Sequence, residues 1–146
     1  MKRQIPTVDL CDYTSCDTSL KSGMIDSLGS GLVEFGFVTV EGHGIEPRLI
    51  REPYALWERF FALEEGVKRR YSGGAGMEGG ARGFTPFGVE HAKDNPTPDL
   101  KEFWHVGQEP AAGHRLRQEY PPNVWPAELP ELRKPTLELY RALEKV

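Results

Sequence analysis

The sequence predicts an α+β fold, in which a layer of helices accompanies a small number of strands. Apolar residues recur every three to four positions in three long segments, which is the spacing of helices that bury one face. Three short runs are rich in β-branched and aromatic residues and are bounded by glycine or proline, which predicts strands. The 16 glycines and 12 prolines predict long irregular connections between these elements.

The first strand is predicted within residues 4–10, QIPTVDL. Pro6 has no N–H to donate to a ladder, so this strand is expected at a sheet edge. The following residues, CDYTSCDTS, are typical of a turn, and Asp17, Thr18 or Ser19 is expected to cap a helix.

A helix is predicted over residues 19–35, where apolar residues recur every four positions. Gly29 and Gly31 each weaken it by roughly 1 kcal/mol relative to alanine, so a close approach to another element is expected there. The helix leads directly into GFVTVEGHG, residues 36–44, a second predicted strand that packs back on it.

A second helix is predicted from Pro47, because proline suits the first helical turn. Its apolar pattern fades near Arg70 and Tyr71, and Pro53 is expected to kink or restart it. The basic run Lys68, Arg69 and Arg70 is expected to close its C-terminus, where cations are favoured.

Residues 72–83 hold six glycines and have no apolar period. A phosphate-binding loop needs a Lys-Ser or Lys-Thr pair after its glycines, and none follows here. A mobile surface loop is the preferred interpretation.

The third strand is predicted at Phe103–Val106, in DLKEFWHVG, after an extended, proline-punctuated segment. The residues after it contain five prolines and are expected to be irregular. A last helix is predicted from about residue 129 and is unfinished at Val146. Three strands do not close a sheet, so residues 1–146 are expected to be a single N-terminal domain of a longer fold.

Composition excludes several classes of function. The net charge of −4 argues against nucleic-acid binding, which usually requires a basic face. No apolar run approaches the roughly 20 residues of a membrane span, and the N-terminus has no signal-peptide core. Cys11 and Cys16 are interpreted as reduced thiols of a cytoplasmic protein.

Several short motifs together resemble a known family. In order, they are IPTVDL, a helix, GFVTVEGHGI, FFALEEGVKRRY, GFTPFG, DLKEFWHVG and NVWP. This series is similar to the N-terminal region of the isopenicillin N synthase-like oxygenases, which are non-haem Fe(II) enzymes and mostly 2-oxoglutarate-dependent. The resemblance implies a helical layer plus the first few strands of an incomplete double-stranded β-helix, or jelly roll, completed by a C-terminal jelly-roll domain.

The family's iron ligands are written H-x-D with a later histidine, and an Arg-x-Ser holds 2-oxoglutarate. Such a triad leaves iron positions open for oxygen and substrate. The residues two positions after the four histidines are Ile45, Lys93, Gly107 and Leu116, so no H-x-D is present. We therefore expect no catalytic residue, metal or cofactor in this chain alone. Fe(II) and 2-oxoglutarate are implied for a full-length parent.

Arg82, Phe84 and Thr85 are the candidate substrate-binding residues, because the resemblance places them where family members face the substrate. A guanidinium can hold a carboxylate bidentately, and an aromatic ring can pack on the substrate body. The alternative is that Arg82 is a solvated loop residue. Lys101 and Glu102 point to opposite sides of a strand, so charge pairing is favoured over acid–base chemistry.

The histidines are interpreted as structural. His43 is expected to bond a backbone group or cap the next helix, and His91 lies with Glu90 and Asp94 in a polar loop. His105 is either a satisfied strand histidine or a residue on the active-site side of the barrel. His114 is expected to be exposed. Trp125 of NVWP is expected to anchor the long loop, with Pro126 fixing its direction.

The leading hypothesis is the N-terminal, non-catalytic part of an Fe(II) oxygenase that acts on a small molecule. The alternative is a stand-alone interaction module that assembles as a homo-oligomer or by domain swapping through exposed strand edges. A separate metal site built from the four histidines is a third, disfavoured hypothesis. The sequence specifies neither the substrate nor the outcome of the reaction.

Overall fold

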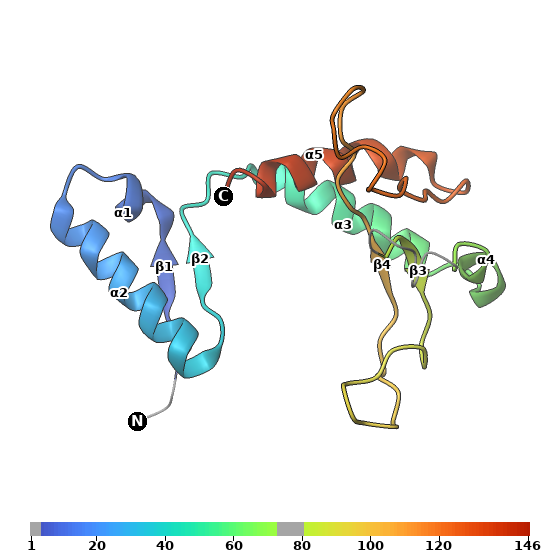
Figure 1. Ribbon diagram of the computed structural model, residues 1–146, viewed down its shortest axis with the longest axis horizontal. Coiled ribbons are helices and arrows are strands. Elements are labelled where there is room, and N and C mark those ends of the chain that lie inside the picture. Colours follow the sequence, from blue (N-terminus) through green and yellow to red (C-terminus); the bar gives the residue numbers. More distant parts are fainter. Residues whose placement is uncertain (1–3, 73–80) are drawn as a thin grey trace. The chain divides into compact units, whose positions relative to one another are not determined.

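The computed structural model describes residues 4–72 and 81–146. They divide into two compact units, which are treated separately below: one contains the described residues up to Glu46 together with Ala142–Val146, and the other is Pro47–Arg141. The combination of helices with a few short strands confirms the predicted α+β class (Figure 1).

The first unit pairs two short strands beside one long helix (Figure 1). Strand β1, Thr7–Asp9, runs parallel to β2, Thr39–Glu41, with Val8 opposite Val40. Both strands were predicted, with longer bounds. The intervening turn region contains a five-residue helix that was not predicted, α1, Leu10–Thr14, whose N-cap Asp9 accepts from the Cys11 N–H at 2.8 Å.

Helix α2, Thr18–Phe35, confirms the predicted helix and one of its proposed caps, although Leu20, Ile25 and Leu32 of its apolar stripe are exposed. The Asp17 carboxylate accepts hydrogen bonds from the backbone N–H groups of Ser19 and Leu20, which satisfies donors that the first turn leaves free. Gly36 ends the helix in the left-handed region at φ 79°, a conformation that glycine adopts without steric cost.

The two glycines inside α2 differ. A Cβ on Gly31 would lie 2.4 Å from Val38 Cγ1 and 2.6 Å from Pro6 Cγ, so this helix position must be small. A Cβ on Gly29 would meet nothing within 4 Å. The predicted close approach is therefore confirmed at Gly31 and wrong at Gly29.

The second unit begins with α3, Pro47–Phe61, which starts at the predicted proline. The prediction of a restart at Pro53 was wrong, since the helix runs through this buried residue without a break. The predicted end near residue 70 belongs to a separate helix, α4, Glu65–Arg69, which carries Lys68 and Arg69 in its last turn. The predicted glycine-rich loop falls mostly on residues 73–80, outside the described residues.

Two antiparallel strands complete the second unit's sheet. Strand β3, Gly83–Thr85, was expected only as an extended segment, whereas β4, Phe103–His105, was predicted as a strand. Phe84 lies opposite Trp104 in this pair. Each of these strands pairs with one other strand in the part of the chain that the structure describes.

Aromatic side chains make the centre of the second unit. Phe60, Phe84, Leu129 and Leu132 form a buried cluster, and Trp57 and Trp104 pack against it among other partly buried residues. The Trp57 indole N–H donates to Thr136 Oγ1 at 3.1 Å, which links α3 to the last helix.

The last helical segment begins with a 3-10 turn, η1, Pro130–Leu132, and continues as α5, Arg133–Leu143. Helix α5 ends at Leu143 and a turn follows, in which the Val146 N–H bonds the Leu143 carbonyl.

Candidate functional site

The candidate substrate-binding residues lie at β3 and are all buried. Arg82 precedes the strand and is 7% exposed, and Phe84 and Thr85 belong to it. The Phe84 ring lies in the aromatic cluster, with its centroid 5.9 Å from that of Phe60. Arg82 is therefore not a solvated loop residue, and the alternative stated for it was wrong.

The guanidinium of Arg82 rests on the backbone of Gly107. A Cβ built on Gly107 would lie 2.1 Å from Arg82 Cζ, so only glycine leaves room for this side chain as it stands. Arg82 Nη1 donates to its neighbour's carbonyl, Ala81 O, at 2.8 Å, while its buried Nε has no acceptor among residues 4–72 and 81–146. Among the described residues no carboxylate pairs with Arg82. A buried cation without an anionic partner is costly, which makes this guanidinium suited to an anion.

Gly107 is held by a side chain that sequence reasoning missed. Asn123 Oδ1 accepts from the Gly107 N–H, and Asn123 Nδ2 donates to the Gly107 carbonyl, both at 2.8 Å. Because His105 pairs with Gly83, residue 107 would pair with residue 81 if the ladder continued. The Asn123 amide instead makes the two backbone hydrogen bonds that residue 81 would make to Gly107. The sequence signal for this role is Asn123 at the start of NVWP, because an amide side chain can both donate and accept hydrogen bonds.

Asn123 also begins a polar chain toward α5. Its Nδ2 donates to Glu109 Oε1 at 3.1 Å, and Glu109 Oε2 accepts from Arg133 at 2.8 Å. Burial alone would raise the pKa of Glu109, but the hydrogen bond from Asn123 and the charge of Arg133 hold that pKa below its ordinary value. These residues, with Arg117 and Trp125, line a cavity of about 570 Å³.

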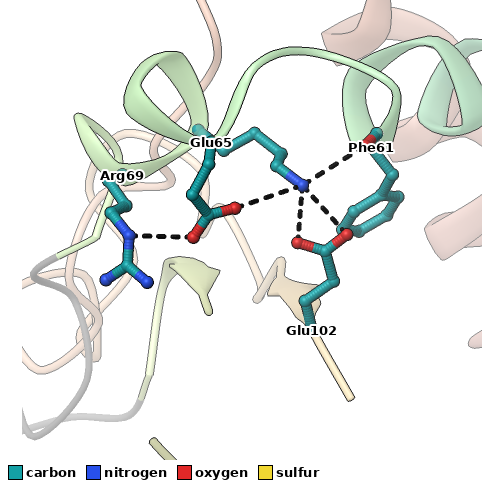
Figure 2. A network of polar contacts seen from close by, with 5 residues as sticks. Phe61, Glu65, Arg69 and Glu102 are labelled. Atoms are coloured by element: carbon teal, nitrogen blue, oxygen red, sulfur yellow. Dashed lines mark hydrogen bonds and ion pairs between the residues drawn. The ribbon is translucent and has the colours of Figure 1, made fainter. Parts of the chain in front are cut away.

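A second polar network fixes β4 to the end of α4, as Figure 2 shows. Lys68 Nζ lies 2.7 and 3.0 Å from the two Glu102 oxygens, 3.4 Å from Glu65 and 3.3 Å from the Phe61 carbonyl. Glu65 also pairs with Arg69 at 2.8 Å. The Lys68 side chain is only 8% exposed, so the basic run supplies a buried ion pair as well as a helix end.

The neighbouring Lys101 takes part in a different, exposed set of charges. Its ammonium lies 3.0 Å from Asp99 and 3.1 Å from Glu90. Hydrogen bonds to Asp99 and then to Glu90 raise the pKa of Lys101 above its ordinary value. Lys101 pairs with Asp99 and Glu90, whereas Glu102 pairs with Lys68. The expectation that Lys101 and Glu102 serve in charge pairing is therefore confirmed.

Hydrogen bonds of Tyr71, which follows α4, connect it to Ala127 and Glu128 in the loop before η1. Its hydroxyl donates to Glu128 Oε2 at 2.6 Å and accepts from the Ala127 N–H at 2.8 Å, and Arg70 pairs with Glu128 as well. Burial and the bond to Glu128 raise the pKa of Tyr71, and the same bond lowers the pKa of Glu128.

Each of the four histidines has a local contact within its own unit. His43 Nδ1 accepts from the Ile45 N–H at 3.0 Å, as expected of a residue that bonds the backbone before α3. His114 is exposed and accepts from the Leu116 N–H. His91 is exposed beside the Ala92 carbonyl. His105 is exposed on β4, with its ring edge-on to Phe103 at 4.8 Å.

The residues present do not fit the iron triad of the oxygenases. In residues 4–72 and 81–146 no three His, Cys, Asp or Glu side chains gather closely enough to hold a metal ion. The sequence has no His-x-Asp in its full length. Cys11 and Cys16 are free thiols. No helix among the described residues combines the length and apolarity that crossing a membrane requires.

Replacing Gly107 with alanine tests whether the Arg82 guanidinium packs against the Gly107 backbone. The new methyl must displace the guanidinium, and we expect a loss of about 1–3 kcal/mol in the free energy of unfolding. Gly66→Ala in α4 is the matched control, because its Cβ meets nothing within 4 Å and helix propensity favours alanine. Adding Arg82→Ala to Gly107→Ala should cost less than the two single losses combined. Additive losses in urea unfolding would contradict this packing.

Comparison with known proteins places the chain in a family. Residues 5–128 match the family described as "non-haem dioxygenase in morphine synthesis N-terminal". The chain is 31% identical to the 2-oxoglutarate-dependent dioxygenase citB of Monascus ruber, over 97% of this chain and 44% of that protein. It is 32% identical to the 2-oxoglutarate-dependent dioxygenase traH of Penicillium crustosum, over 99% and 45%.

Solved structures agree in fold. A 2OG-Fe(II) oxygenase family protein from Caulobacter crescentus superposes with a TM-score of 0.72 at 35% identity, over 97% of this chain and 44% of that one. Neurospora crassa T7H, solved in complex with alpha-KG, gives 0.71 at 23% identity. The chain thus spans somewhat less than half the length of the relatives it matches. It belongs to the family formed by the N-terminal region of the non-haem, 2-oxoglutarate-dependent dioxygenases.

Proposed function

We propose that this chain is the N-terminal, non-catalytic part of a non-haem Fe(II) oxygenase that uses 2-oxoglutarate and acts on a small molecule. One combined observation carries the proposal. Relatives named 2-oxoglutarate-dependent dioxygenases match nearly all of this chain but only 44–45% of their own length, and no histidine here is followed by the aspartate of the triad. Fe(II) and 2-oxoglutarate would then be held by the remaining half, in a jelly roll that also completes the sheets.

Within that enzyme the chain would support the fold and form part of the substrate entrance. The buried, incompletely bonded guanidinium of Arg82 supports a role in holding an anionic group of the substrate. Thr85 would contribute at the same strand, and Phe84 would fix its position through the aromatic cluster. A small-molecule substrate accords with one relative, named Validamycin A dioxygenase. The free thiols of Cys11 and Cys16 accord with a cytoplasmic enzyme.

Mixing the purified chain anaerobically with Fe(II) and 2-oxoglutarate tests its non-catalytic role. Because the chain lacks the H-x-D of the facial triad, we expect no metal-to-ligand charge-transfer band and no succinate on exposure to oxygen. A stoichiometric band would contradict the proposal. Full-length Neurospora crassa T7H, solved in complex with alpha-KG, is the positive control.

The reading frame after Val146 separates this proposal from the stand-alone interaction module. A downstream H-x-D, a later histidine and an Arg-x-Ser would identify the parent as an oxygenase. A stop codon at that point would favour the module, which the comparisons do not favour.

A further inference from the structure

A cavity of about 570 Å³ is lined by the loop that follows β4 and by Arg133 at the start of α5. Both of these parts belong to the second unit. The candidate substrate-binding residues, Arg82, Phe84 and Thr85, are not in its lining. Pockets of this volume commonly hold a small organic molecule, and the chemistry of the lining indicates which kind.

The charged side chains of the lining leave one positive charge without a partner. Glu109 accepts hydrogen bonds from Asn123 at 3.1 Å and from Arg133 at 2.8 Å, and its lowered pKa keeps it ionised. Arg117 donates to the Pro110 carbonyl at 2.7 Å and pairs with no carboxylate of the described residues. A guanidinium has five N–H donors, so the exposed Arg117 keeps donors for an anion that arrives from solvent.

Aromatic and proline side chains form much of the remaining wall. Tyr120 and Trp125 are both half-buried in the lining, and aromatic rings favour stacked or edge-on contacts with another ring. The prolines of the wall are Pro110, Pro121 and Pro122.

The wall also holds an unused hydrogen-bond donor. The Trp125 indole Nε1 is buried with no hydrogen-bond partner in the part of the chain that the structure describes, although its N–H lies near enough to Glu109 to help lower that pKa. A buried indole N–H usually finds an acceptor. The lining therefore suits a flat ring that carries negatively charged oxygen atoms.

We propose that this cavity is a binding site for a small aromatic carboxylate. The carboxylate pairs with Arg117, whose planar guanidinium can hold two oxygens at once, and the ring lies against Tyr120 and Trp125. A cationic ligand would be repelled by Arg117 and Arg133, and the carboxylate of Glu109 is already bonded. The site is built from this chain's own residues, so the inference does not depend on the proposed oxygenase function.

Proton–nitrogen correlation NMR of the 146-residue chain tests the proposal, with 2-naphthoate as the probe. Each of the three tryptophans gives one indole N–H signal, and Trp125→Phe identifies that of Trp125. We expect 2-naphthoate to shift the Trp125 signal in a saturable way. The signals of Trp57 and Trp104 should stay, because these residues line a different cavity, of about 440 Å³. Shifts of Trp57 or Trp104 without a shift of Trp125 would overturn the proposal.

Two analogues test the charge and the ring separately in the unchanged chain. 2-Naphthamide has nearly the same shape without the charge, and we expect it to bind about tenfold or more weakly, because charge-assisted hydrogen bonds are roughly twice as strong as neutral ones. Decahydro-2-naphthoate keeps the charge but has no aromatic ring, and we expect about threefold or more weaker binding. Equal affinity of 2-naphthoate and its amide would contradict the role given to the carboxylate.

Substitution of Arg117 tests the residue that holds the carboxylate. We expect Arg117→Gln to bind 2-naphthoate about tenfold or more weakly, and Arg117→Lys to lie in between, because lysine keeps the charge but not the planar fork. Arg115→Gln is the matched control, at an exposed arginine of the same loop that is not in the lining. If the Trp125 signal shows that Arg117→Gln has rearranged the loop before any probe is added, the comparison of acid and amide decides.

Three further outcomes would overturn the proposal. An unmoved Trp125 signal at millimolar 2-naphthoate would show that the cavity does not take an aromatic acid. An equal loss of affinity in Arg115→Gln and Arg117→Gln would show attraction by the charge of the loop in general. A proline-rich peptide that shifts Trp125 where 2-naphthoate does not would show that the aromatic wall binds a peptide instead.

Discussion

Replacing Glu102 with glutamine should lower the free energy of unfolding of the second unit by about 3 kcal/mol. The substitution removes the charge that faces Lys68 at 2.7 Å, and both side chains are largely buried, 8% and 14% exposed. Lys68 then keeps only Glu65 at 3.4 Å and the Phe61 carbonyl. Breaking a buried pair on one side typically costs about 3–5 kcal/mol, because the remaining charge stays desolvated.

The double substitution Lys68→Met with Glu102→Leu should restore most of this loss. Removing both charges abolishes the desolvation cost together with the attraction, and such replacements are often neutral or stabilising. The matched single control is Lys101→Met, whose partners Asp99 and Glu90 sit at the surface with a 50% exposed lysine. Its expected loss is much smaller than that of Glu102→Gln, because solvent screens exposed pairs.

Urea unfolding followed by tryptophan fluorescence measures these changes in the right part of the chain. All three tryptophans, Trp57, Trp104 and Trp125, belong to the second unit. A loss for Glu102→Gln no larger than that for Lys101→Met would contradict the view that the buried pair holds β4 to α4. A double variant as unstable as Glu102→Gln would contradict the desolvation argument.

The local elements of the fold were predictable because local chemistry specifies them. The Asp17 cap, Gly36 after α2, and Pro47 at the start of α3 follow from backbone groups within one helical turn. The strand at Phe103–His105 followed from its β-branched and aromatic composition. Pro53 shows the limit of such reasoning. Local rules disfavour proline inside a helix, yet α3 continues through this buried residue without a break.

The partners of polar residues were not predictable, because they depend on contacts far apart in sequence. Lys68 and Glu102 are 34 residues apart, and Asn123 and Gly107 are 16 apart. In the sequence alone, the basic run at Lys68–Arg70 is equally consistent with a helix C-terminus and with a buried ion pair. The candidate residue Arg82 was found through the family resemblance, but its seat on Gly107 appears only when β3 and β4 are paired. Its contact with substrate remains a prediction.

Phe60→Ala should give the other large loss, about 3–5 kcal/mol in the unfolding free energy of the second unit. Phe60 is 0% exposed and lies at the centre of the buried cluster. Its ring centroid lies 4.8 Å from Trp104, 5.4 Å from Phe61, 5.7 Å from Trp57, 5.9 Å from Phe84 and 6.3 Å from Tyr71. Truncation leaves a cavity bounded by these rings, so the loss of transfer free energy is joined by a cavity penalty.

The same helix supplies the control and the graded variant. Tyr54→Ala in α3 removes an aromatic ring that is 70% exposed, and its expected cost is about 0.5 kcal/mol, typical of surface positions. Phe60→Leu keeps most of the volume and should cost clearly less than Phe60→Ala. A Phe60→Ala loss close to that of Tyr54→Ala would mean that the cluster collapses onto the vacated space. Since Phe60 touches both Phe84 and Trp104, a large loss would also show that α3 supports the β3–β4 pair next to Arg82.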